Sequence, residues 1–155
     1  MFKVLTMSML IWASLASAAN VESNIDKKGI GIQGYDPVSY FKSKEPQKGI
    51  QKFQSKQGEI TYWFMNEDNR QEFIKDPKKY EPQFGGWCAF AIADSKSKVE
   101  INPKSFVIQD GRLLLFYKGL WGNTREKWLN TNSKDPKAFL KEADGNWSEV
   151  KTKGP

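Results

Sequence analysis

The residues that could do chemistry in this chain are few, and one cysteine stands out among them. Cys88 is the only cysteine in 155 residues, and the sequence contains no histidine. The missing histidine excludes Ser-His-Asp triads, Cys-His dyads and histidine-ligated zinc or haem. A single cysteine also excludes an intramolecular disulfide and any site that needs several cysteines from one chain. These absences exclude the usual forms of catalysis, and the residue types alone indicate no reaction.

The segment around Cys88 has an unusual composition. Between residues 76 and 91 it contains two prolines, two glycines, four aromatic residues and the cysteine. Gly85-Gly86 allows a positive φ or a close approach of another backbone. Two interpretations follow: a tight turn, or backbone N–H groups presented to an anion. The apolar stretch from Trp87 to Ala93 predicts a buried helix or strand.

The elements that must position this segment predict an α+β fold. We expect a single domain with a small antiparallel sheet of two hairpins, covered by short helices. The expected strands are 51–55 and 59–64 in the first hairpin, and 106–109 and 112–117 in the second. Lys56-Gln57-Gly58 joins the first pair, and Asp110-Gly111 is a strong two-residue turn signal in the second. The continuously apolar run Leu113–Phe116 predicts a central strand that is covered on both faces.

Helix starts are indicated by capping residues. Asp-Pro pairs at 36, 76 and 135 predict an aspartate N-cap followed by proline in the first helical position. Asn66 predicts the cap of a helix that ends near Lys75, and Asn123 with Glu126 predicts a capping box. Gly145 is the expected stop of the last helix.

Several separated motifs resemble the YHS-domain family. The matching segments are Gly34–Phe41, Tyr62–Phe64, Asn69-Arg70 with Phe73, Pro77–Ala89, Pro103, Asp110–Tyr117, Trp128 and Ala143–Trp147. They cover about residues 30–147 in order, and the last of them resembles the ending of exported stand-alone bacterial members. The resemblance implies a small exported or modular domain associated with metal handling, and it brings no defined catalytic activity.

The resemblance carries over one soft ligand, Cys88. We expect a metal-ion or small-ligand binding module in which Cys88 coordinates a metal and Asp36 and Tyr80 supply oxygen donors. Copper and zinc are the candidate metals, and either needs two to four nitrogen or sulfur ligands. Two Cys88 thiolates across a dimer, or oxygen donors that include Glu81, could complete such a site.

Two alternatives stand beside the metal hypothesis. Cys88 could be a buried structural residue in a structural or protein-interaction domain with no bound ligand. It could also form an intermolecular disulfide or another redox centre. An enzyme would need carboxylate or lysine chemistry, because the usual nucleophile–base pairs lack a base here.

The charge balance is basic. The chain has 24 Lys and Arg against 18 Asp and Glu, a net charge of +6. The lysines are scattered and form no dense stripe, and an exported protein is not expected to bind nucleic acid. Anionic envelope lipid or polysaccharide is a better target, although charge of this size also serves solubility.

The N-terminus predicts export. Lys3, the apolar run from Val4 to Leu15 and the small residues Ala16-Ser17-Ala18 form a signal-peptide pattern over residues 1–18. The run is shorter than the roughly 20 apolar residues of a membrane span. We therefore expect a periplasmic or secreted protein that does not span a membrane. Its parts are a flexible leader (19–29), one YHS-like domain (30–147) and a flexible tail (148–155).

Overall fold

The computed structural model describes residues 22–130 and 135–155, and it confirms the α+β class. The predicted signal peptide lies outside the described residues. The larger elements are β1 (Ile50–Gln57), β2 (Ile60–Phe64), α2 (Glu67–Lys75), α4 (Ala89–Ser95), β3 (Asn102–Gln109), β4 (Arg112–Phe116), α5 (Thr124–Leu129) and α6 (Pro136–Val150). The shorter ones are η1 (Ile32–Gly34), α1 (Ser39–Lys42), α3 (Pro77–Tyr80), η2 (Phe84–Gly86), β5 (Lys118–Gly119) and β6 (Gly122–Asn123).

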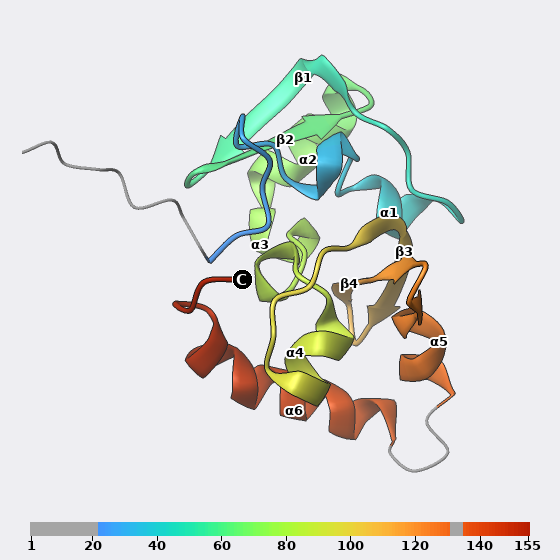
Figure 1. Ribbon diagram of the computed structural model, residues 1–155. Helices are drawn as coiled ribbons and strands as arrows, with labels where there is room; N and C mark the ends of the chain where they lie inside the picture. Colours follow the sequence, from blue (N-terminus) through green and yellow to red (C-terminus); the bar gives the residue numbers. More distant parts are fainter. Residues whose placement is uncertain (1–21, 131–134) are drawn as a thin grey trace, which may run out of the picture.

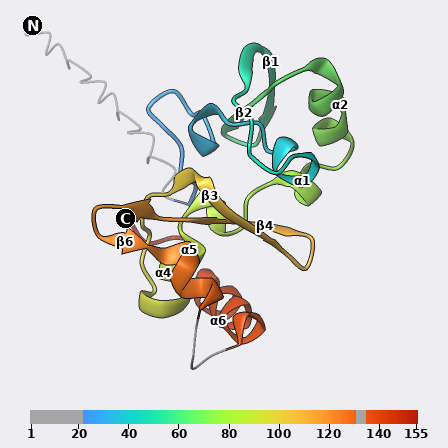
Figure 2. The same ribbon diagram turned by 90° about the vertical axis from the view of Figure 1, so that its right-hand side faces the viewer.

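Both hairpins form as predicted, and each is a separate two-stranded antiparallel sheet. In the second, Asp110 and Gly111 have φ values of 51° and 73°, which is the backbone that a two-residue hairpin turn requires. In the first, Gln57 pairs with Ile60, so the turn is Gly58-Glu59 rather than the predicted Lys56-Gln57-Gly58. Figure 2 shows the β3–β4 hairpin between the half that holds β1, β2 and α2 and the half that holds α4 and α6.

Strand β4 separates two hydrophobic cores. Leu113 and Leu115 face one core, and Leu114 and Phe116 face the other, because successive strand residues point to opposite sides. We call the first the upper core, after its position in Figure 1, and the second the lower core. This arrangement explains the continuous apolar run of the strand, since both of its faces are covered.

The upper core lies under the first hairpin. Tyr62 and Phe64 of β2 pack against Phe73 of α2, with ring centroids 5.0 and 5.1 Å apart. Helix α2 begins as predicted, because the Asn66 side chain accepts a hydrogen bond from the Asn69 N–H. Asp76, in contrast, makes no side-chain capping bond to α3, although that helix starts at Pro77 as expected.

Helices α4, α5 and α6 enclose the lower core, with α4 packed along α6 (Figure 1). The predicted stop at Gly145 is wrong, because α6 continues to Val150. Val150 is buried, and Trp147 packs on the same core. Burial of these two side chains outweighs the helix-breaking tendency of a glycine in the middle of the helix. Asp135 caps α6 as predicted, through a bond from the Lys137 N–H.

Both ends of the described chain pack on the domain, and α6 continues past residue 147 to Val150. The indole N–H of Trp87 donates to the Glu22 carbonyl, which ties the leader to η2 and α4. Lys98 is buried, and its ammonium donates to the carbonyls of Lys151 and Lys153 beyond α6. In the described ranges, none of the helices has both the length and the apolar character required to cross a membrane.

Candidate functional site

Cys88 is fully buried at the start of α4, between the two cores. Its side chain belongs to the upper core, while Trp87 and Ala89 on either side belong to the lower one. The chain alternates between cores here because the backbone at Cys88 is extended, with φ −61° and ψ 113°. The predicted buried segment Trp87–Ala93 thus enters as extended backbone and continues as helix α4.

The thiol of Cys88 both donates and accepts a hydrogen bond. The Tyr117 N–H lies 3.4 Å from Sγ and donates to it. The Thr124 hydroxyl oxygen lies 3.3 Å from Sγ, and that hydroxyl already donates its only proton to the Tyr117 carbonyl at 3.0 Å. The S–H of Cys88 must therefore be the donor to Thr124. A protonated thiol fits this arrangement, whereas a metal-binding thiolate would leave Thr124 without its donor.

Asp36 is fully buried, and its carboxylate accepts four hydrogen bonds. Oδ1 accepts from the N–H groups of Val38 and Ser39, at 2.8 and 3.3 Å. Oδ2 accepts from the Met65 N–H at 2.9 Å and from the Asn69 side-chain amide at 2.6 Å. These bonds satisfy the carboxylate within the fold. The predicted N-cap position is wrong, because α1 begins at Ser39 with Val38 as its N-cap, and Asp36 holds the turn before the helix instead.

Tyr80 is buried at the end of α3 and is also bonded inside the fold. Its hydroxyl donates to Glu72 Oε2 at 3.1 Å, and its ring meets Phe41 edge-on at 5.3 Å. Glu72 also pairs with Lys42, and the pKa of this carboxyl is lowered mainly by that bond and further by the one from Tyr80. The phenol hydroxyl thus supports the ion pair that joins Lys42 of α1 to Glu72 of α2.

The three predicted ligands do not form one donor set. Cys88, Asp36 and Tyr80 are each bonded to different residues and share no partner. Within residues 22–130 and 135–155, no group of three or more His, Cys, Asp or Glu side chains is placed to hold a metal ion. Because the sulfur is buried, two copies of this fold also cannot bring their thiols together. The residues present therefore do not fit a copper or zinc centre.

The Gly85-Gly86 turn receives the leader rather than an anion. Gly85, at φ 60°, accepts a hydrogen bond on its carbonyl from the Asn24 N–H at 2.8 Å. A Cβ on Gly85 would lie only 2.2 Å from the Glu22 carbonyl oxygen, so glycine is required for this approach. The turn interpretation of the sequence is confirmed, with the added function of holding residues 22–24.

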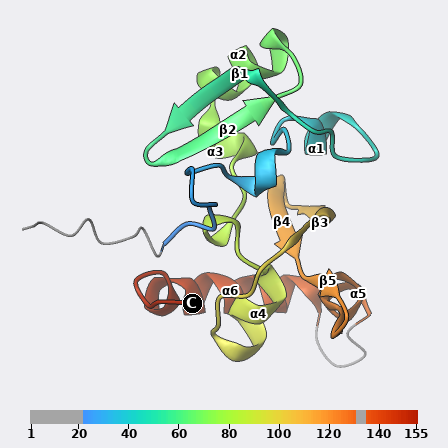
Figure 3. The same cartoon turned by 45° about the horizontal axis from the view of Figure 1, so that its top comes forward.

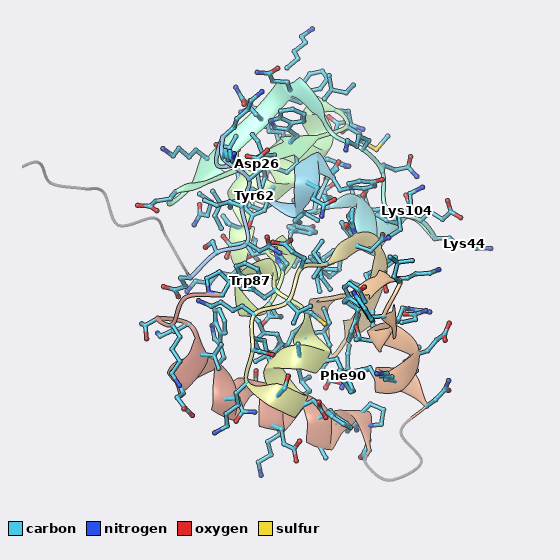
Figure 4. All side chains as sticks on the ribbon, viewed as in Figure 1. Asp26, Lys44, Tyr62, Trp87, Phe90 and Lys104 are labelled. Atoms are coloured by element: carbon cyan, nitrogen blue, oxygen red, sulfur yellow. The ribbon has the colours of Figure 1, made fainter. Side chains whose placement is uncertain are left out.

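A cluster of cations that the sequence did not reveal lies on the other side of the molecule. Lys44 and Lys104 both line two adjoining hollows of about 410 and 540 Å³. Figure 4 shows these two lysines near one another, beside α1 and the start of β3. Lys48 lines the first hollow, and Arg125 lines the second. We call this surface, Lys44, Lys48, Lys104 and Arg125 with the rings of Tyr35 and Phe106, the basic groove.

Two aromatic rings line the basic groove, and two of its four cations, Lys48 and Arg125, are held by direct contacts. Phe106 lines both hollows and stacks edge-on against Tyr40 at 4.9 Å. The Lys48 ammonium lies 4.9 Å from the centre of the Tyr35 ring and donates to the Gln33 carbonyl at 3.0 Å. Arg125 donates from Nε to the Phe106 carbonyl at 2.8 Å, which orients the guanidinium.

The charge of the basic groove is not neutralised by its surroundings. Glu45 is the one carboxylate among the residues that line the two hollows. In the part of the chain that the structure describes, none of the four cations forms an ion pair. Another hollow of about 410 Å³, lined by Phe84 and Gly85, contains a cation that is neutralised. Its Arg112 is bonded to Asp144 and to Gln83.

Comparison with known proteins adds no relative. No family model, no curated protein and no solved structure matches this chain. The resemblance to YHS domains accordingly stays a prediction from the quoted motifs. Evidence on function comes from the burial, bonds and charges described above.

Proposed function

We propose that this chain is an exported YHS-like domain that binds a small anionic ligand in the basic groove and has no catalytic role. The observation that carries the proposal is the position of Lys44 and Lys104. Both lysines are exposed and line the same two hollows, Lys44 from the loop after α1 and Lys104 from β3, and neither forms an ion pair with another described residue. Cations beside the exposed edges of Tyr35 and Phe106 favour a ligand that carries a carboxylate or phosphate group next to an apolar part.

In this proposal Cys88 is structural. Its burial and its two hydrogen bonds support the alternative of a buried structural cysteine over the metal hypothesis. The same holds for Asp36, whose carboxylate organises the turn before α1. In this proposal the ligand is therefore not a metal ion at Cys88, and the basic groove takes the place of the predicted metal site.

The test is a titration of the isotope-labelled chain with phenyl phosphate, in which the amide chemical shifts report binding. We expect shift changes at residues of the basic groove, such as Lys48 and Phe106. The double variant Lys44→Gln/Lys104→Gln is expected to weaken binding about tenfold or more, equivalent to about 1.4 kcal/mol. Inorganic phosphate and benzyl alcohol serve as probes of the charged and apolar parts alone.

The matched control is Lys56→Gln, which removes an exposed lysine from β1, outside the groove. This variant should bind phenyl phosphate as the parent chain does. Shift changes confined to other surfaces, or equal weakening by the control, would contradict the proposed site.

A further inference from the structure

The β5–β6 hairpin presents two large apolar side chains to solvent. Leu120 and Trp121 at its tip are 98% and 87% exposed, the highest values among the large hydrophobic side chains of the described residues. The hairpin lies beside α5, as Figure 3 shows. Exposure of a tryptophan and a leucine together is costly in water, so a covering medium is expected.

The tip is a built feature rather than a frayed loop. Lys118 pairs with Asn123, and Gly119 pairs with Gly122, in an antiparallel ladder. The Tyr117 hydroxyl accepts a hydrogen bond from the Trp121 N–H at 3.2 Å. A Cβ on Gly119 would lie 2.6 Å from that same hydroxyl oxygen, so the close packing of the phenol against the hairpin requires glycine. The fold thus holds Leu120 and Trp121 outward.

The surroundings of the tip are basic. Lys118 is exposed on the hairpin, and the exposed residues Arg125 and Lys127 follow in α5 on different sides of that helix. The nearby acidic residue Glu126 accepts a hydrogen bond from the Asn123 side chain at 2.8 Å. An apolar tip that carries Lys118, with further cations in the helix that follows, is complementary to a surface that is anionic outside and apolar beneath.

We propose that the β5–β6 hairpin docks the protein on an anionic lipid surface, with Leu120 and Trp121 inserted among the acyl chains. Trp is well suited to the boundary between lipid and water, and cations beside it add attraction to anionic headgroups. A stable protein interface needs about 800 Å² per partner, which two side chains on a narrow hairpin do not supply. A deformable lipid surface has no such requirement.

The experiment is co-sedimentation of the full chain with phosphatidylcholine vesicles that contain phosphatidylglycerol, together with tryptophan fluorescence. We expect binding that increases with the phosphatidylglycerol content and a blue shift of the emission. The double variant Leu120→Ser/Trp121→Ser should lower the partition coefficient about tenfold or more and abolish the blue shift. Ile74→Ser is the control, because Ile74 is an exposed apolar residue on α2 in the other half of the molecule.

Two outcomes would overturn the proposal. The parent chain could fail to bind the anionic vesicles, or the tip variant could bind them as the parent does. Phenyl phosphate binding by the tip variant is a separate readout, so failure of this inference is distinguishable from failure of the basic groove.

Discussion

The side-chain amide of Asn69 donates a hydrogen bond to Oδ2 of Asp36 across 2.6 Å, and this buried bond joins α2 to the turn before α1. The other carboxylate oxygen of Asp36 holds the N–H groups of Val38 and Ser39. Oδ2 also receives the Met65 N–H, at the end of the first hairpin. One carboxylate therefore connects the turn before α1 to residues 65–69, where the first hairpin ends and α2 begins.

The first prediction concerns this carboxylate. Asp36→Asn replaces one acceptor oxygen with an NH₂ group that faces existing donors, so buried N–H groups lose their partner. We expect the free energy of unfolding to fall by about 2–4 kcal/mol, since each unsatisfied buried group costs about 1–3 kcal/mol. Urea unfolding followed by circular dichroism measures the change. Asp94→Asn, at an exposed position on α4, should leave stability within about 0.5 kcal/mol of the parent.

The second prediction concerns the thiol of Cys88. Because Sγ is fully buried, we expect a thiol reagent such as DTNB to leave the native chain unlabelled and to react once urea unfolds it. Cys88→Ser should lower the free energy of unfolding by about 1–3 kcal/mol, because a more polar group is buried in an apolar core. Rapid labelling of the native chain would contradict the structural role.

Metal binding provides an independent check of that role. Native mass spectrometry of the chain purified without chelators, with copper or zinc then added, should show no stoichiometric adduct. An adduct that disappears in Cys88→Ser, particularly at one metal per dimer, would return Cys88 to the role of ligand.

Local signals explain what could be predicted about the fold. The Asp110-Gly111 turn and the Asn66 cap depend on backbone conformation and on bonds within three residues, so their residue types suffice to predict them. The end of α6 cannot be predicted from local residue types, because burial of Val150 in the lower core decides whether the helix continues past Gly145.

The candidate site was harder to predict, for the same reason. Cys88, Asp36 and Tyr80 stand out by residue type, but their bonds run to Thr124, Asn69 and Glu72, which no spacing in the sequence indicates. The basic groove brings Lys44 together with Lys104 from a distant part of the chain. Lysine is common and scattered here, so only the packing of α1 against β3 shows which of them converge.

The third prediction is a loss of stability at alkaline pH. The pKa values of Tyr40 and Tyr62 are raised well above the ordinary value of 10.0, and burial of the two hydroxyls is the main cause. The unfolded tyrosines ionise near pH 10, and the folded ones do not, so their contribution to stability is present below pH 10.0 and is lost as the pH rises above it. We expect the tyrosinate absorbance of these two residues to appear only with unfolding. Tyr40→Phe and Tyr62→Phe should each remove part of that delayed absorbance, and its retention in both variants would contradict the assignment.

The fourth prediction compares two glycines that the structure uses in opposite ways. Gly145 lies inside α6 with open space where a Cβ would stand, so Gly145→Ala should raise the free energy of unfolding by about 0.5–1 kcal/mol. Gly85 has a positive φ, and an added Cβ would meet the Glu22 backbone. Gly85→Ala should therefore lower the free energy of unfolding by about 1–3 kcal/mol. Hydrogen exchange distinguishes local from global effects, because the Asn24 N–H bonds the Gly85 carbonyl and should lose protection in Gly85→Ala alone. If the Asn24 amide keeps its protection in that variant, the Gly-Gly turn does not hold the leader.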